Sequence, residues 1–341
     1  MKKIALLCTL FMIVFAVTLS GCIDENDADS ASSEKIVVAV SIAPQAEFVE
    51  KVAGDNVEVL LMVPQGADPH SYEPTPSQFV DLSNAKMYAM VGSGLTFEDV
   101  MMDKIEDLNP DMLVVDCSQG ITLVEMAEHE HDHEDEAGHE DEHEDEVGHE
   151  EEHDHEDEAG HEGEHDHEDE ADHEEEHDHE GLDPHIWTSP DNVEVMVENI
   201  YQGLVEIDPA NQATYLGNKD AYLAELQALD ENIRDTLSGK EGSSFMVYHP
   251  AWGYFANHYD LVQVPVEIEG KEPSVRDMQA VIDEANEKGI KVIFVQSGFS
   301  TVSASAVASE IGGEVVEVDP LAKDYIDNLS KVAEAFEKGL A

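Results

Sequence analysis

A run rich in histidine and acid is the most unusual chemical feature of this chain. Residues 128–180 contain 14 of the 18 histidines and 31 of the 79 acidic residues, and no Lys or Arg. The block HEDEAGHE at His133–Glu140 returns at His155–Glu162, and close variants begin at His143 and His167. Neutral imidazole binds Zn²⁺, Cu²⁺ and Ni²⁺, and carboxylates add oxygen ligands. The repeated spacing therefore favours metal binding over the alternative, a solvated acidic linker.

The run is expected to bind metal weakly and to have no fixed fold. It lacks the apolar residues that offset the entropy of ordering a chain, so we predict a disordered insert. It would hold several ions as a reservoir beside a tighter site. Its candidate ligands are the following fourteen histidines: His129, His131, His133, His139, His143, His149, His153, His155, His161, His165, His167, His173, His177 and His179.

Three of the four remaining histidines lie beside a proline in short loops. His70 and His185 each end an Asp-Pro-His sequence, His249 begins a His-Pro sequence, and Asp319 follows the last predicted strand. In parallel α/β domains, ligands bind at the carboxyl ends of strands. Three imidazoles and one carboxylate suit Zn²⁺, although a lone loop histidine is more often a surface residue, so both interpretations stay open. We predict that His258, which follows a helix, is a surface residue.

Alternating strands and helices must position these residues. Each predicted strand is apolar throughout, which is typical of βαβ units with a parallel sheet that is covered on both faces. The strands are expected at residues 36–40, 57–63, 87–91 and 112–116, and again at 245–248, 262–267, 291–295 and 315–318. The second half of the chain thus repeats the rhythm of the first.

One long helix separates the two halves. From Pro209 to Leu237 the chain has no further proline, and apolar residues recur every three or four positions from Tyr215 onward. A single helix here would be about 43 Å long. We predict that it joins two lobes. A surface helix packed along one domain is the alternative.

The predicted fold is therefore α/β, with two lobes that each contain a mainly parallel sheet flanked by helices. We place the lobes at residues 35–207 and 239–341, with the linking helix at 208–238. The formal net charge of the chain is -63. This charge argues against nucleic acid as a partner and against electrostatic attachment to an anionic membrane.

Residues 1–22 are interpreted as a lipoprotein signal segment. Lys2 and Lys3 precede an apolar stretch, and the segment ends in LSGC at Cys22. We expect lipidation of Cys22 and a flexible tether at residues 23–34, which would anchor the protein outside the membrane. A transmembrane helix is the alternative. Cys117 then has no partner for a disulfide, and we predict a buried structural thiol.

Five motifs, in order, make the chain similar to a known family. It resembles the zinc-binding solute-binding proteins of metal ABC transporters, the class with a rigid linking helix. The resemblance extends over nearly all of residues 35–340. The motifs are GADPHSYEPTPS (Gly66–Ser77), DPHIWTSP (Asp183–Pro190), YHPAWGYF (Tyr248–Phe255), EGKEPS (Glu269–Ser274) and VDPL (Val318–Leu321).

The resemblance implies a function and a ligand set. The implied ligands are His70, His185 and His249, with Asp319 or a water molecule as the fourth, and the metal would lie between the lobes. The implied function is capture of Zn²⁺ and its delivery to a membrane ABC permease with its ATPase. Manganese-binding relatives carry Glu at the position of His249, which favours Zn²⁺ over Mn²⁺ or another divalent metal. We expect a monomer without enzymatic activity.

Two functions of other classes stay open on the residues alone. Three histidines and an open fourth position also describe the catalytic site of a zinc hydrolase. Against this, the sequence has no HExxH motif and Asp319 would close the site. In the other alternative, an adhesion or metal-storage lipoprotein, the run at 128–180 would itself be the functional part.

Overall fold

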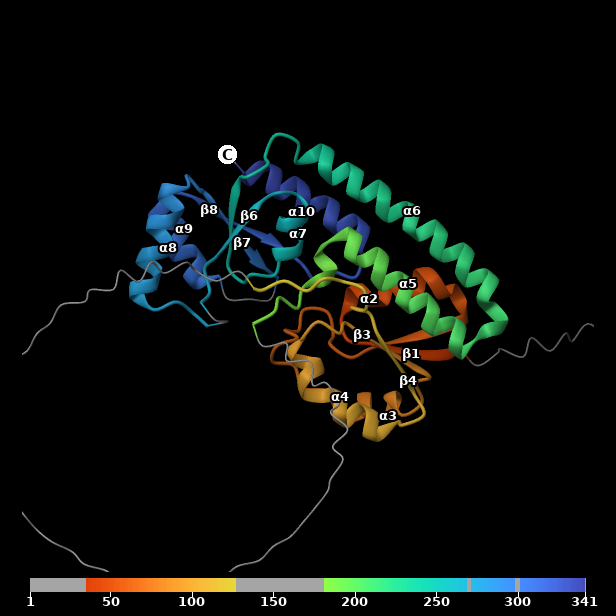
Figure 1. Cartoon of the computed structure of the whole chain (residues 1–341). Helices are drawn as coiled ribbons and strands as arrows, with labels where there is room; N and C mark the ends of the chain where they lie inside the picture. The colour runs from red at the N-terminus through yellow and green to blue at the C-terminus, as the bar shows by residue number, and fades with distance from the viewer. Residues whose placement is uncertain (1–34, 127–180, 269–270, 298–300, 341) are drawn as a thin grey trace, which may run out of the picture.

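The computed structural model describes residues 35–126, 181–268, 271–297 and 301–340 (Figure 1). The predicted signal segment, Cys22, the tether and the histidine run fall outside these residues. Within them, the chain forms two parallel sheets of four strands each. None of the helices in these described ranges combines the length and the apolar character needed to cross a membrane.

The first sheet has the strand order β2-β1-β3-β4, and all its neighbouring strands are parallel. Its central strand β1 has a fully buried end, because Val38, Ala39 and Val40 have no exposed surface. Helices α2 and α5 lie on one side of the sheet, and α3 and α4 on the other (Figure 1). The bounds are β1 (Ile36–Val40), α2 (Ala43–Ala53), β2 (Val57–Leu61), α3 (Pro76–Leu82), β3 (Met87–Met90), α4 (Thr96–Leu108), β4 (Leu113–Asp116) and α5 (Pro190–Ile207).

The second sheet repeats this topology with the order β6-β5-β7-β8. Side chains of β5 alternate between two cores: Phe245 packs with Phe336 of α10, whereas Met246 packs with residues of α8 and α9. The bounds are β5 (Ser244–Val247), α7 (Gly253–His258), β6 (Val262–Pro265), α8 (Val275–Glu287), β7 (Val292–Gln296), α9 (Val302–Ile311), β8 (Glu314–Val318) and α10 (Tyr325–Gly339). The predicted α/β fold with two parallel sheets is confirmed.

Helix α6 (Gln212–Thr236) corresponds to the predicted long helix and spans about 38 Å. It follows a short 3-10 turn at Pro209–Asn211. Helix α6 packs against α2 and α5 beside the first sheet and against α10 beside the second (Figure 1). These contacts favour a joining helix over a helix packed along one domain. Its buried residues keep the predicted spacing: Tyr215, Lys219, Tyr222, Leu226, Leu229 and Ile233.

Two local predictions have clear outcomes. Cys117 is a buried free thiol, as predicted. Strand β2 ends at Leu61 rather than at residue 63. The next two backbone N–H groups, of Met62 and Val63, still donate to the carbonyls of Val40 and Ser41 at 2.9 and 3.0 Å. The apolar pattern thus continues two residues beyond the strand because these residues are buried against the turn that follows β1.

Candidate metal centre

Three histidines from distant parts of the chain converge in the structure. His70 lies in the loop between β2 and α3, His185 precedes the 3-10 turn Ile186–Thr188, and His249 follows β5. The centroids of the His70 and His185 rings are 5.8 Å apart, and each of the other two pairs is 5.1 Å apart. One ring nitrogen from each histidine lies within 4.8 Å of the others. The structure therefore brings three of the four predicted ligands together.

The imidazole of His70 is held through one nitrogen only. Its Nδ1 lies 3.1 Å from Oγ1 of Thr96, the first residue of α4. Its Nε2 is buried and has no hydrogen-bond partner among the described residues. Asp68 fixes the turn, because its Oδ1 accepts a 2.9 Å hydrogen bond from the backbone N–H of His70. The ring therefore offers Nε2 to a ligand.

His185 is oriented by the carboxylate two residues before it. Oδ1 of Asp183 accepts hydrogen bonds from the backbone N–H of His185 at 2.9 Å and from its ring Nδ1 at 2.7 Å. A carboxylate only accepts, so the hydrogen of the neutral ring lies on Nδ1 and the lone pair lies on Nε2. Asp183 is fully buried and His185 is 3% exposed. The buried hydrogen bond to Asp183 thus fixes this tautomer.

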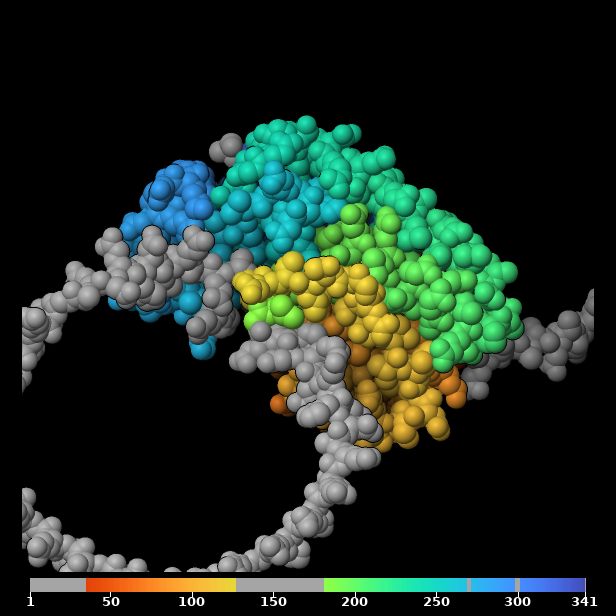
Figure 2. Space-filling view, viewed as in Figure 1, coloured from red at the N-terminus to blue at the C-terminus, as the bar shows by residue number. Residues whose placement is uncertain are grey.

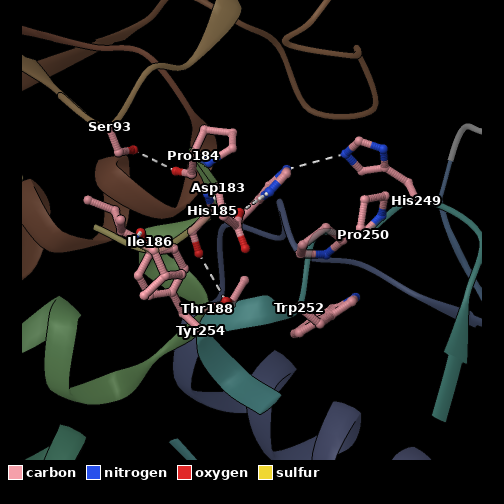
Figure 3. A network of polar contacts seen from close by, with 12 residues as sticks. Ser93, Asp183, Pro184, His185, Ile186, Thr188, His249, Pro250, Trp252 and Tyr254 are labelled. Carbon is pink, nitrogen blue, oxygen red and sulfur yellow. Dashed lines mark hydrogen bonds and ion pairs between the residues drawn. The ribbon is translucent and has the colours of Figure 1, made fainter. Parts of the chain in front are cut away.

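His249 has the same arrangement in the other half of the molecule. Its Nδ1 lies 2.8 Å from Oε2 of Glu267, which follows β6. Its Nε2 points toward Nε2 of His185 at 3.3 Å (Figure 3). By the tautomer argument, both Nε2 atoms carry lone pairs, so no hydrogen atom joins them. Converging lone pairs of this kind fit coordination of a cation such as Zn²⁺, which prefers nitrogen ligands in a tetrahedral set.

Burial keeps His70 and His185 in the neutral form that binds metal. Burial and, to a lesser extent, the nearby rings of His185 and His249 together lower the pKa of His70 to about 3. Burial also lowers the pKa of His185, against the opposing effect of Asp183. Neutral imidazole is the form that coordinates a metal ion, so these two ligands are ready at neutral pH.

Asp319 lies directly after β8 and does not belong to the histidine cluster. Its Oδ1 accepts a 2.8 Å hydrogen bond from the backbone N–H of Leu321, and burial raises the pKa of its carboxyl group. The next residue ties this loop to the His185 turn, because the carbonyl of Pro320 accepts a 2.7 Å bond from Nε1 of Trp187. The role of Asp319 as fourth ligand stays a prediction.

His258 belongs to a separate group that connects α5, α6 and α7. Its Nε2 lies 2.7 Å from Oδ1 of Asp230 and 2.8 Å from Nη2 of Arg234, and its Nδ1 lies 3.5 Å from Oδ2 of Asp191. The side chains of Asp191, Asp230 and His258 lie close enough together to surround an ion. A guanidinium at hydrogen-bond distance repels a cation, so we interpret the group as an ion-pair network.

The segment 91–96, which contains the loop after β3 and the first residue of α4, contacts one proposed ligand and the residue before another. Besides Thr96, it carries Ser93, whose Oγ donates to the carbonyl of Pro184 at 2.6 Å (Figure 3). Glu98 anchors the same loop: its carboxylate accepts from the backbone N–H groups of Val91 at 2.6 Å and Gly92 at 2.9 Å. Nothing in the sequence pattern indicated Ser93 or Thr96. Glu267 was also missed, although it could have been found: like Asp319, it is an acidic residue at the end of a predicted apolar strand.

Comparison with known proteins shows the family of the chain. A family model described as zinc-uptake complex component A, periplasmic, matches residues 38–339. The chain belongs to this family. It is 31% identical to the high-affinity zinc uptake system protein ZnuA of Bacillus subtilis, over 97% of this chain and 91% of that protein.

Two further relatives of the zinc-uptake component A family extend the comparison. The manganese-binding lipoprotein MntA of Halalkalibacterium halodurans is 27% identical and matches over the full length of both chains. A crystal structure of ZnuA superposes with a TM-score of 0.72 and 35% sequence identity, covering 90% of this chain and 99% of that one. The fold and the family thus agree, while the relatives include proteins named for two different metals.

Proposed function

We propose that this chain captures Zn²⁺ outside the cytoplasm and delivers it to a membrane ABC permease that works with an ATPase. The observation that carries the proposal is the convergence of three imidazoles from distant parts of the chain, each with one ring nitrogen within 4.8 Å of the others. The zinc uptake protein of Bacillus subtilis, at 31% identity, supports Zn²⁺ as the cargo. His70, His185 and His249 are the proposed ligands, with Asp319 or a water molecule in the fourth position.

In this proposal the chain is a binding protein without a catalytic role. It would act as a monomer anchored at Cys22 outside the membrane, with lobes at residues 35–207 and 239–341. Periplasmic location in the family description and the lipoprotein name of the manganese-binding relative support that placement. Helix α6 contacts helices beside both sheets, which supports limited hinge motion during release.

Metal analysis tests the proposed function directly. Protein purified without added metal is expected to contain about one zinc ion per chain that survives dialysis, since the three imidazoles already converge before an ion binds. The variant lacking residues 128–180 serves as a control, because it contains only the proposed tight site. Another bound metal, or no retained metal in either form, would contradict the proposal.

Manganese is the second candidate cargo, because the relative that matches over its full length is named for it. His249→Glu is expected to move the preference from Zn²⁺ toward Mn²⁺, since it replaces a borderline nitrogen ligand by a hard oxygen. Competitive binding of both metals to the form lacking residues 128–180 measures this preference. If the selectivity stayed unchanged, His249 would not be a ligand.

A further inference from the structure

Two buried carboxylates flank the histidine cluster without belonging to it. Asp183 lies 2.7 Å from Nδ1 of His185, and Glu267 lies 2.8 Å from Nδ1 of His249. Asp183 has no exposed surface and Glu267 is 9% exposed. The two acids come from opposite halves of the molecule, one before the turn at 186–188 and the other after β6. Each therefore contacts the nitrogen that faces away from the converging Nε2 atoms.

The second oxygen of Asp183 has no compensating hydrogen bond. Its Oδ2 is buried and lacks a partner in the described part of the chain. The backbone of α7 closes against it, since a Cβ placed on Gly253 would lie 2.3 Å from Oδ2. A buried carboxylate with an unpaired oxygen is costly unless an opposite charge lies nearby. An ion bound at the Nε2 atom of His185 would supply that charge.

We propose that Asp183 and Glu267 set the charge selectivity of the site, so that it prefers a divalent over a monovalent cation. This inference rests on the proposed function. Three neutral imidazoles, two carboxylates and Zn²⁺ sum to zero charge, whereas the same groups with Cu⁺ leave one negative charge unbalanced. If Asp319 is the fourth ligand, the net charge of the site becomes more negative by one unit with either ion, and the site with Zn²⁺ is still the closer to neutral. In a buried site such imbalances are weakly screened and therefore matter.

The two carboxylates also orient the rings, and this positioning role must be separated from the charge role. A hydrogen bond to Nδ1 fixes the tautomer and the direction of Nε2 for any ion. Loss of orientation would therefore weaken Zn²⁺ and Cu⁺ alike. Loss of charge would weaken Zn²⁺ more. Zn²⁺ and Cu⁺ differ in softness as well as in charge, but the substitutions leave the ligand atoms unchanged, so the intrinsic preference of each ion cancels when its affinities for variant and unmodified protein are compared.

The test uses Asp183→Asn and Glu267→Gln. Both substitutions nearly preserve size and keep a carbonyl oxygen that can accept the ring N–H, but they remove the charge. Affinities for Zn²⁺ and, without oxygen, for Cu⁺ are measured by competition with chromophoric chelators. We expect the Zn²⁺ affinity of each variant to fall about 10- to 100-fold. The Cu⁺ affinity should fall less, so that the ratio of the two affinities drops about tenfold or more.

Asp68→Asn is the matched control. Asp68 also precedes a proposed ligand in an Asp-Pro-His sequence and bonds the backbone N–H of His70, but the ring of His70 contacts Thr96 instead. Its carboxylate also acts electrostatically on His70 and His185, but it is partly exposed and screened by water, so the affinity ratio should change less than in the two test variants. Circular dichroism checks the fold, and the absorption spectrum of bound Co²⁺ checks the ligand geometry. Because the two test residues lie in different halves, one variant suffices if the other fails to fold.

The outcomes separate the two proposals. A drop in the ratio of Zn²⁺ to Cu⁺ affinity with an unchanged Co²⁺ spectrum supports the charge role. Equal losses for both ions would reduce the carboxylates to positioning residues and overturn it, and so would unchanged affinities. Absence of tight Zn²⁺ binding by the unmodified protein would instead overturn the proposed function.

Discussion

At the scale of single residues, the three histidines and Asp319 should contribute unequally to Zn²⁺ affinity. Removal of His70, His185 or His249 by mutation to Ala deletes a nitrogen ligand that water replaces poorly, so Zn²⁺ affinity should fall about 100-fold or more. Asp319→Ala should cost less if water can take the fourth position. Calorimetric titration of the form lacking residues 128–180 measures these losses.

His258→Ala is the matched control for these truncations. His258 lies in the ion-pair network with Asp230 and Arg234, away from the cluster. Its removal should leave Zn²⁺ affinity unchanged, since no proposed ligand depends on it. An equal loss in His258→Ala and His70→Ala would show that the ligand assignment is wrong.

Glu98 predicts a pH dependence of stability that is independent of the metal. Its side chain is buried, and burial raises its pKa from 4.5 to about 7. The folded protein then keeps a proton that the unfolded chain releases, so this group destabilises the fold as the pH rises from about 4.5 to 7. The effect corresponds to about 3 kcal/mol. Glu98→Gln should remove this pH dependence. Urea unfolding of metal-free protein at a series of pH values measures the free energy of unfolding for the comparison.

The control for Glu98 lies on the same helix. Glu106 is exposed on α4, and Glu106→Gln should leave the pH profile of the unfolding free energy as it is in the unmodified protein. The ligand histidines contribute equally to all three proteins and cancel in the comparison. Parallel profiles for Glu98→Gln and the unmodified protein would mean that Glu98 is ionised in the fold throughout this range.

At the scale of elements, α7 lies so close to Asp183 that replacing a glycine of this helix by alanine should destabilise the protein, although alanine has the higher helix propensity. Gly→Ala in a helix usually stabilises by roughly 0.5–1 kcal/mol. At Gly253 the added Cβ would lie 2.3 Å from Oδ2 of Asp183, so the carboxylate or the helix must move. We expect Gly253→Ala to lower both the melting temperature and the Zn²⁺ affinity, because Asp183 orients His185.

Gly217→Ala is the contrasting change on α6. A Cβ at Gly217 meets nothing within 4 Å, so this substitution should raise the unfolding free energy by the usual helix increment and leave Zn²⁺ binding unaltered. Thermal unfolding and calorimetry of both variants make the comparison. Equal changes in melting temperature and Zn²⁺ affinity for Gly253→Ala and Gly217→Ala would show that a side chain at Gly253 does not clash with Asp183.

Local signals were strong enough to predict most elements. Ser274 caps α8: its side chain accepts from the backbone N–H of Asp277 at 3.3 Å, and its own N–H donates to the Asp277 carboxylate at 3.0 Å. Strand β1 matches its predicted bounds because a β-branched run between polar residues leaves little choice. Such features depend on neighbours in sequence, so a single chain suffices to find them.

The supporting contacts of the site could not be predicted in the same way. Proline and strand ends singled out His70, His185 and His249, but Thr96 is an ordinary first residue of a helix in sequence. Its contact with His70 depends on how the loop after β2 folds over the start of α4. Contacts of this kind join residues far apart in the chain and leave no periodic trace.

At the scale of the whole molecule, the proposed tight site and the histidine run should be separable. Deletion of residues 128–180 removes no residue of the two hydrophobic cores and none of the proposed ligands. One tight Zn²⁺ site should remain, and weaker sites should disappear, since the composition of the run predicts that it must be ordered on binding, which lowers affinity. Calorimetric titration of both forms, with circular dichroism for the fold, decides. Loss of the tight site would place a primary ligand in the run.

The two chain segments that border the run meet at an isolated antiparallel bridge between Glu125 and Leu182. The backbone N–H of Met126 donates to the carbonyl of Gly181, and that of Asp183 to Val124, at 3.0 and 2.9 Å. These borders lie side by side on one face (Figure 2, yellow and light green). The distance that the intervening chain must span is thus the same whatever its length.

Because the residues on both sides of the run are paired with each other, the length of the run can change during evolution at little cost in folding free energy. Closure entropy grows only with the logarithm of loop length, so for an unordered segment one more eight-residue block would cost on the order of 0.1 kcal/mol. Duplication or loss of such blocks would be nearly invisible to selection on stability. The copy number of HEDEAGHE-like blocks could therefore drift or be tuned to metal supply, while the residues that surround His185 stay under a separate constraint.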